Sequence, residues 1–255
     1  MIRSLVVLVL AAALVGCGGG SEVELERFDV ESRLLGRSLE QIAIDPGGHG
    51  RPLLVLLHGH GGDPDDVASN GLLEELERLG DRAPAVLLVN GDHSYYHDRA
   101  DGQWGSYVLD EAIPAGVRRL RADGRRVAIG GFSMGGFGAF DLARLRPARF
   151  CAVGGHSPAL WRTGGETPVG AFDDAADFDR HDLFGDPLGA GLRVWLDVGA
   201  DDSFHDATVA YADLLSRSGA HVTAHVWPGD HSSAYWREHL SAYLEFYVSA
   251  LADCR

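Results

Sequence analysis

Lysine is absent from this 255-residue chain, in which all 22 basic residues are arginine. The absence excludes a P-loop lysine, Schiff-base chemistry and a Ser–Lys catalytic dyad. Acidic residues number 37 and give a formal net charge of −15, which argues against nucleic acid as a partner. Internal repeats and long low-complexity segments are also missing, and the length suits a single domain with a full core.

Cysteine is scarce, and the first of the three cysteines lies in an unusual context. Arg3 precedes an apolar run at 5–14 that is shorter than a typical membrane span, and the run leads to Cys17 and a Gly/Ser stretch. This segment resembles a bacterial lipoprotein signal, although an ordinary secretory peptide that happens to contain Cys17 is the alternative. Both interpretations predict export, and lipidation would hold the protein on a membrane face of the cell envelope. The lipoprotein interpretation divides the chain into a signal peptide at 1–16, the lipidated Cys17 with its tether at 17–21, and a folded domain at 22–255.

The other two cysteines, Cys151 and Cys254, are 103 positions apart. Export permits a disulfide between them, but spacing alone cannot prove one. A small buried thiol at Cys151, at the start of an expected strand, is an equally good interpretation.

Apolar strand-like segments alternate with helix-like segments along most of the chain. The first two segments, 22–31 and 34–44, alternate polar with apolar residues and predict an antiparallel edge pair. Further strands are expected at 52–57, 85–89, 127–132, 150–154, 192–198 and 222–227. Helices are expected at 72–79, 107–121 (where Pro114 would kink or break the helix), 136–146, 208–216 and 235–251. We therefore expect an α/β fold with a mostly parallel sheet, helices on both faces, and a ligand site at the carboxyl ends of the strands.

The pentapeptide at 131–135, Gly-Phe-Ser-Met-Gly, lies between an expected strand and an expected helix. Such a strand–turn–helix context is typical of a nucleophile elbow, whose tight turn requires small residues around the serine. The helix N-terminus would favour negative charge developing beside Ser133. The pattern therefore predicts that Ser133 is a catalytic nucleophile.

A serine nucleophile needs a base and an orienting carboxylate. Asp201 and Asp202 follow the expected strand at 192–198, and we favour Asp202 as the acid; either could instead cap the helix at 208–216. His231 follows the last expected strand and precedes the last helix, a position from which a loop can reach Ser133. The order Ser133, Asp202, His231 is that of an α/β-hydrolase.

The Gly-rich segment at 58–63 follows the first central strand and can aim backbone N–H groups inward. The N–H groups of Met134 and His60 are the expected oxyanion-hole donors. The alternative is a metal site, built from His58, His60 and Asp63 or from a second set after the strand at 85–89; we favour the oxyanion role and expect no metal. That second set comprises Asp92, His93 and His97.

Several segments resemble the esterase family of α/β-hydrolases that includes esterase D and the antigen 85 mycolyltransferases. They are the segments at 54–59, 104–108 with 113–114, 130–139, 199–204 and 230–232. The resemblance implies a triad of Ser133, His231 and the second aspartate of the pair, Asp202, with Met134 and His60 in the oxyanion hole. It also implies cleavage of carboxylic esters or thioesters, or acyl transfer, without a metal or organic cofactor. The lipoprotein signal distinguishes the chain from esterase D, and its shorter length distinguishes it from the mycolyltransferases.

Aromatic residues near expected strand ends are candidates for the substrate pocket. Tyr95, Tyr96, Trp104 and Trp161 could line it, although the loop at 92–97 could equally be surface structure packed on its own aromatics. The acidic, Gly-rich segment 164–184 forms either a cap over the site or a solvated excursion. If its aspartates face the pocket, they would disfavour an anionic substrate.

Together these patterns predict an exported serine hydrolase that acts on a small-molecule ester through an acyl-enzyme intermediate. The rival functions are an acyltransferase of the antigen 85 type and a non-catalytic lipid-anchored binding protein. The chain offers no pattern that identifies the ester, its acyl length or the oligomeric state.

Overall fold

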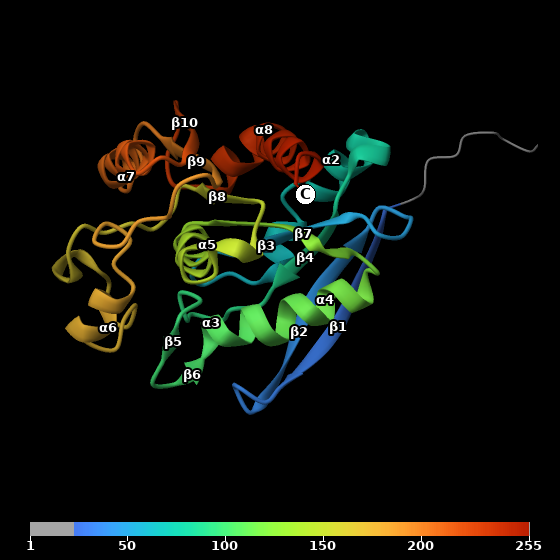
Figure 1. Ribbon diagram of the computed structural model, residues 1–255, viewed down its shortest axis with the longest axis horizontal. Coiled ribbons are helices and arrows are strands. Elements are labelled where there is room, and N and C mark those ends of the chain that lie inside the picture. The colour runs from blue at the N-terminus through green and yellow to red at the C-terminus, as the bar shows by residue number, and fades with distance from the viewer. Residues whose placement is uncertain (1–22, 255) are drawn as a thin grey trace, which may run out of the picture.

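The computed structural model describes residues 23–254, so the expected signal peptide, tether and Cys17 lie outside the described residues. Its centre is an eight-stranded sheet in the order β1-β2-β4-β3-β7-β8-β9-β10 (Figure 1). The strands of this sheet are β1 (Glu24–Ser32), β2 (Arg37–Asp45), β3 (Pro52–Leu57), β4 (Ala85–Val89), β7 (Asp123–Phe132), β8 (Ala152–His156), β9 (Arg193–Gly199) and β10 (His221–Trp227). A separate two-stranded ribbon pairs β5 (Asp98–Arg99) with β6 (Gly102–Gln103).

Helices occupy most of the connections between the strands. They are α1 (Pro64–Ala68), α2 (Leu72–Leu79), α3 (Trp104–Tyr107), α4 (Ile113–Arg119), α5 (Met134–Leu145), α6 (Ala175–Arg180), α7 (His205–Arg217) and α8 (Ser233–Ala252). Between residues 23 and 254, no helix has the length and apolar character needed to cross a membrane.

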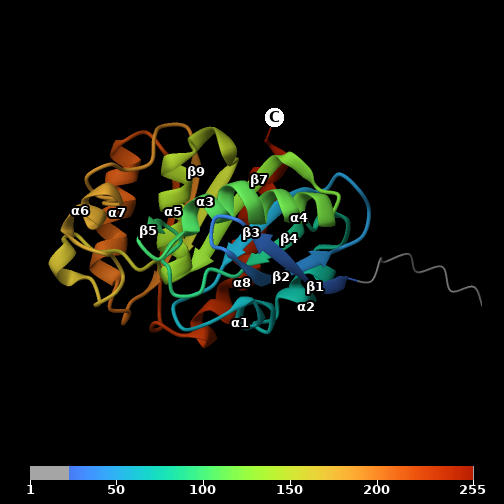
Figure 2. The same ribbon diagram turned by 90° about the horizontal axis from the view of Figure 1, so that it is seen from below.

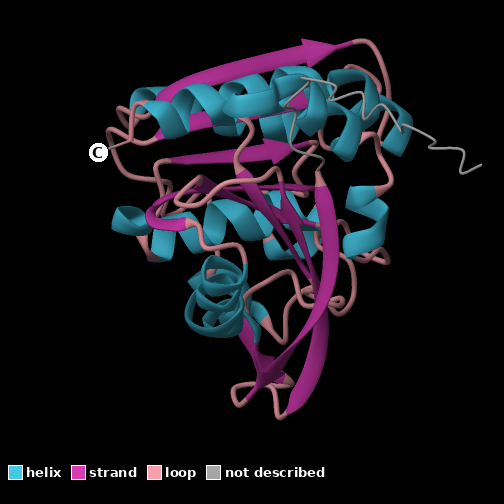
Figure 3. Cartoon of the chain, turned by 90° about the vertical axis from the view of Figure 1, so that its right-hand side faces the viewer, coloured by secondary structure: helices cyan, strands magenta, loops and turns pink. Residues whose placement is uncertain are grey.

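The expected fold class is confirmed. In the eight-stranded sheet, β4, β3, β7, β8, β9 and β10 run parallel to one another, whereas β1 pairs antiparallel with β2, and β2 pairs antiparallel with β4. The predicted antiparallel edge pair is therefore present, with its boundaries displaced by one to three residues. Figure 3 shows the twist of the strands relative to one another, with helices on either side of the sheet.

Alternation along the central strands separates two apolar layers. In β3, Leu53, Val55 and Leu57 face the layer that contains α4, α5 and α7, and Leu54 and Leu56 face the layer that contains α1, α2 and α8. All five side chains are buried, as expected of a parallel strand covered on both faces. Figure 2 shows α3 and α4 on one side of the sheet and α1, α2 and α8 on the other.

The prediction of a single helix at 107–121 is wrong in its start and in its regularity. The chain is helical from Trp104 to Arg119, but Val108–Ala112 forms a π-helical turn between α3 and α4. Pro114 lacks an N–H for the carbonyl of Asp110, and its ring would clash with that carbonyl in a regular helix. The wider π-helical turn just before the proline removes the ring clash and the need for the missing hydrogen bond, and the helix continues.

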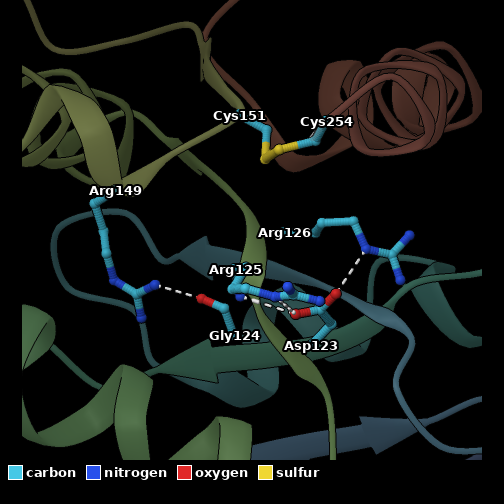
Figure 4. The surroundings of a disulfide bond; sticks show 7 residues. All are labelled: Asp123, Gly124, Arg125, Arg126, Arg149, Cys151 and Cys254. Atoms are coloured by element: carbon cyan, nitrogen blue, oxygen red, sulfur yellow. Dashed lines mark hydrogen bonds and ion pairs between the residues drawn. A yellow bond between two sulfur atoms is a disulfide. The ribbon is translucent and has the colours of Figure 1, made fainter.

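Cys151 and Cys254 form a disulfide in the structure, with their Cα atoms 5.7 Å apart. The bond joins the residue before β8 to the chain end beyond α8, beside the start of β7, where Arg126 donates to Asp123 at 3.0 Å (Figure 4). It thus closes a long loop between two elements that both help to build the site described next.

Candidate active site

Ser133 lies at the tight turn between β7 and α5, with φ 53° and ψ −114°. Backbone bonds hold it there: its N–H donates to the His156 carbonyl at 3.0 Å, and its own carbonyl accepts from Ala159 at 2.9 Å. A positive φ is strained for any residue with a Cβ, so the turn survives because neighbouring structure enforces it.

The glycines of the pentapeptide are required by close backbone packing. A Cβ at Gly131 would overlap the backbone of Gly135, and a Cβ at Gly135 would overlap the carbonyl of Leu57 in β3. The expectation that the serine needs small neighbours is thereby explained by two specific contacts.

Three side chains from three loops form one hydrogen-bonded chain. The His231 Nε2 atom lies 2.9 Å from the Ser133 hydroxyl, and the His231 Nδ1 atom lies 2.8 Å from Asp202 Oδ2. Asp202 comes from the loop after β9, and His231 comes from the loop between β10 and α8. Because Asp202 can only accept, Nδ1–H donates to it, and Nε2 is left to accept from the serine hydroxyl.

Asp202, rather than Asp201, reaches His231. The Asp202 side chain is fully buried, while Asp201 points to solvent. Burial raises the pKa of Asp202, but the hydrogen bonds from His231 and from the Phe204 N–H outweigh it and hold that pKa below its usual value. Neither aspartate caps α7, whose N-cap residue is Phe204.

The loop after β3 lies against the nucleophile. Gly59 packs on Ser133, since a Cβ there would stand 3.6 Å from the serine Cβ. Met134 is the first residue of α5, so its N–H has no acceptor within the helix. His60 lines the same cavity as Ser133, and the assignment of its N–H and the Met134 N–H as oxyanion donors stays a prediction.

Two buried side chains, whose roles sequence reasoning missed, support this loop. The His58 Nδ1–H donates to the Gly59 carbonyl at 2.9 Å, and its Nε2 accepts from the Gly91 N–H at 3.1 Å. Burial lowers the pKa of His58, which keeps the ring neutral as this pairing requires. Tyr96 donates its hydroxyl to the His58 carbonyl at 3.1 Å. In the sequence, these roles were indicated only by the positions of both residues, which follow strand ends and lie near the glycines that make room for them.

A cavity of about 460 Å³ opens in front of Ser133 and His231. One wall comes from the loop after β3 and from α1, and the other comes from the first turns of α8. The lining side chains beyond Ser133 and His231 include His60, Asp66, Asn70, Ser232, Trp236 and Arg237. The lining therefore mixes charged, polar and aromatic groups.

The four aromatic residues expected in the pocket do not line this cavity, and that assignment is corrected. Tyr96 is fully buried beneath the loop, and Trp104 borders a different hollow, where Arg37 lies 4.8 Å above its ring. Tyr95 and Trp161 pack on each other at 5.5 Å in a buried aromatic cluster with Phe172. A position after a strand end places a residue near the site but does not determine which way its ring turns.

The segment 164–184 contributes no lining residue to the cavity at Ser133. Its Asp173 pairs with Arg99, and its Asp177 is fully buried against His97. The aspartates therefore do not oppose an anionic substrate there. His97 also lies with Asp177 and His181, and not with the Asp92 and His93 considered as metal partners above.

The protein is a serine hydrolase with the α/β-hydrolase fold. Its class follows from the strand order, the sharp turn at Ser133 and the hydrogen bonds that join Ser133, His231 and Asp202. The family follows from the sequence: residues 43–247 match the family model described as "Putative esterase". The chain belongs to this esterase family and is a serine esterase, a carboxylic ester hydrolase.

Two curated relatives show the range of the family. The chain is 32% identical over 172 residues to the iron(III) salmochelin esterase of Escherichia coli O6:H1 (strain CFT073), covering 61% of this chain but only 41% of that protein. It is 25% identical to the diacylglycerol acyltransferase/mycolyltransferase Ag85B of Mycobacterium leprae, covering 94% of this chain and 88% of the relative.

Solved structures agree on the fold. A ferulic acid esterase superposes with a TM-score of 0.80 at 20% identity, covering 91% of this chain and 100% of the other. An S-formylglutathione hydrolase from Agrobacterium tumefaciens superposes with a TM-score of 0.77 at 19% identity, covering 92% and 98%. At these identities the likeness concerns architecture alone.

Proposed function

We propose that the protein is an exported serine esterase that hydrolyses carboxylic esters or thioesters through Ser133, His231 and Asp202. The observation that supports the proposal is the continuous chain of hydrogen bonds from Asp202 through His231 to Ser133. It ends at a cavity large enough for a small ester. Family membership supports the reaction class, and the hydrogen-bond geometry supports the roles proposed for the three residues.

In the first half of the reaction, the Ser133 oxygen attacks the ester carbonyl while its proton passes to His231 Nε2. The N–H groups of Met134 and His60 stabilise the resulting oxyanion, each contributing about 2.7–4 kcal/mol to transition-state stabilisation. The carbon–oxygen or carbon–sulfur bond then breaks, and His231 returns the proton to the leaving alcohol or thiol. Asp202 holds the His231 tautomer throughout.

In the second half, His231 takes a proton from water as the water oxygen attacks the acyl-enzyme. The tetrahedral intermediate collapses, the acid leaves, and Ser133 regains its proton from His231. Another alcohol in place of this water would give acyl transfer. The near full-length match to an Ag85B acyltransferase makes this the second candidate function.

A fluorophosphonate probe tests the proposed nucleophile directly. We expect covalent labelling of the folded wild-type protein at Ser133 and none in Ser133→Ala, with p-nitrophenyl ester hydrolysis lost in parallel. Labelling that persists in Ser133→Ala would refute the assignment. Product analysis with and without added sugar or glycerol acceptors separates hydrolysis from transfer.

Export and lipid anchoring through Cys17 form the cellular part of the proposal. The disulfide between Cys151 and Cys254 supports an oxidising compartment, where such bonds persist. Mass spectrometry of the N-terminal peptide from the native host should find an acylated Cys17. A Cys17→Ser variant should leave the membrane fraction, and equal membrane retention of that variant would contradict the anchor.

A further inference from the structure

Three buried side chains outside the active site converge on one point. His97 follows β4, while Asp177 and His181 belong to α6 and to the residue that ends it. One ligand-type atom from each lies within 4.8 Å of the other two, and none of the three side chains is more than 8% exposed. None of them lines the cavity at Ser133.

The hydrogen bonding of His181 leaves a lone pair facing an anion. Its Nδ1 lies 2.8 Å from the buried carboxylate of Asp141, to which it donates. In the neutral ring, Nε2 is then an acceptor, and it lies 3.9 Å from Asp177 Oδ1. Two acceptors that face each other in a buried site are stabilised by a proton donor or a cation between them.

His97 completes the set from the other side. Its Nε2 lies 3.2 Å from Asp177 Oδ2, and its ring centre is 4.5 Å from that of His181. Within residues 23–254 its buried Nδ1 has no hydrogen-bond partner, so no second contact fixes the ring as an Nε2–H tautomer. Without an ion, His97 Nε2–H donates to the Asp177 carboxylate, and a cation would bind Nε2 once the proton has moved to Nδ1.

From these contacts we propose that His97, Asp177 and His181 bind one Zn²⁺ ion that has a structural role. Two imidazole nitrogens and a carboxylate oxygen are ligands that Zn²⁺ prefers, and a water would supply the fourth. With bonds of about 2.0–2.1 Å, tetrahedral ligand atoms lie about 3.3 Å apart. His97 Nε2 lies 3.2 Å from Asp177 Oδ2 and His181 Nε2 lies 3.9 Å from the other oxygen, Oδ1, so a small rotation of the carboxylate would direct one oxygen at the ion.

The surroundings of the cluster resemble those of a metal site. A carboxylate that accepts from the second nitrogen of a ligating histidine is a recurrent second-layer contact, and Asp141 makes it here. Arg144 donates to Asp141 at 2.6 Å. Arg180 and the Asp173 N–H each donate to Asp177 at 2.8 Å, and they orient its carboxylate while leaving further lone pairs for the ion.

The proposed ion would join three parts of the chain: the loop after β4, α5 through Asp141, and the segment 164–184. That segment already packs Phe178 of α6 and Leu183 into the apolar core, so the ion would add a polar tie to an apolar one. The proposal does not depend on the esterase reaction, since its residues are separate from Ser133, His231 and Asp202.

The test uses full-length mature protein purified without a metal-affinity tag, stripped with chelator and dialysed. Elemental analysis after incubation with ZnCl₂ should give one zinc per chain, and the thermal midpoint should rise with zinc concentration. His181→Gln and Asp177→Asn should each abolish stoichiometric binding, and Asp141→Asn should weaken it 10–100-fold. His221→Gln, at an exposed histidine on β10, is the matched control and should bind as the wild type does.

Fluorophosphonate labelling and circular dichroism establish that each variant is folded. The proposal is overturned if folded wild-type protein takes up no zinc, or if His181→Gln binds zinc as tightly as the wild type. It is also overturned if NMR shows a doubly protonated His181 ring unaffected by zinc, because a proton would then occupy the place of the ion.

Discussion

Two histidine–aspartate pairs contact Ser133, one through its hydroxyl and one through its backbone N–H, and they differ chiefly in what the second ring nitrogen bonds. In the open pair, His231 bonds Asp202 at 2.8 Å and turns its other nitrogen to the Ser133 hydroxyl and the cavity. In the buried pair, His156 bonds Asp197 at the same 2.8 Å, but its other nitrogen meets the Tyr247 hydroxyl at 3.0 Å. The His231 side chain is 28% exposed, whereas the His156 side chain is 1% exposed.

The buried pair belongs to the scaffold beneath the nucleophile. The His156 carbonyl accepts the Ser133 N–H, and Asp197 also accepts from Trp195 and from Tyr243 of α8. Gly130 and Gly154 leave the space for the Tyr247 hydroxyl, which a Cβ at either position would overlap.

The same chemical pairing therefore serves two purposes. A histidine whose second nitrogen is saturated by a buried donor or acceptor can only hold structure. A histidine whose second nitrogen faces a nucleophile and solvent can move protons. The following substitutions separate the two roles.

The largest effect is expected at the open pair. Asp202→Asn should lower kcat about 10,000-fold, because an amide no longer fixes the His231 tautomer. Steady-state kinetics on a p-nitrophenyl ester measures the loss, with Asp201→Asn as the matched control that keeps wild-type activity. A comparable loss in Asp201→Asn would show that the wrong aspartate was assigned.

At the buried pair, Asp197→Asn should reduce stability instead. It removes the charged acceptor of three buried donors, and we expect the free energy of unfolding to fall by about 3–5 kcal/mol. Urea denaturation measures this change. Asp213→Asn, at an exposed pair with Arg217, should change stability by less than about 1 kcal/mol. Unchanged stability of Asp197→Asn would remove the structural role assigned to His156.

The disulfide joins the residue before β8 to the segment after α8, and Tyr243 and Tyr247 of α8 also bond the buried pair. Replacing Cys151 and Cys254 by serine should cost about 2–4 kcal/mol of unfolding free energy and leave kcat of the folded protein unchanged. Reductant should destabilise the wild type by a similar amount and have no effect on the double variant. A fall in kcat at full folding would mean that the bond also positions the nucleophile.

Acidification should remove the stability that Asp202 contributes to the open pair. The pKa of Asp202 is lowered in the fold, so its stabilisation is complete above the ordinary value of about 3.9 and is lost as pH falls through the lower folded value. The stability difference between wild type and Asp202→Asn should therefore shrink below about pH 4. A difference that stays constant with pH would contradict the shift.

The fold and the three hydrogen-bonded residues could be predicted from the sequence more completely than the lining of the pocket. Strand–turn–helix order and the need for Gly131 depend on local sterics, which can be read from neighbouring residues, whereas the contact of Gly135 with Leu57 joins distant parts of the chain. Asp202 and His231 were favoured because each follows a strand, and parallel strands end at one edge of a sheet.

The structural features that could not be predicted from the sequence depend on contacts between residues far apart in the chain. The pairing of His156 with Asp197 follows from the β8–β9 register, across 41 positions. The role of Tyr96 beneath His58 depends on which side its ring takes, and spacing does not encode this. The cluster of His97, Asp177 and His181 required the fold of the segment 164–184, for which composition left two interpretations.

The backbone of Ser133 implies that this esterase would be more stable without its nucleophile. A non-glycine residue held at φ 53° costs about 1–3 kcal/mol, a cost that glycine largely escapes. Ser133→Gly should accordingly unfold at a higher temperature than Ser133→Ala, although both are inactive. The backbone that activity requires therefore lowers stability at this residue, and the difference in unfolding temperature between the two inactive variants measures that loss.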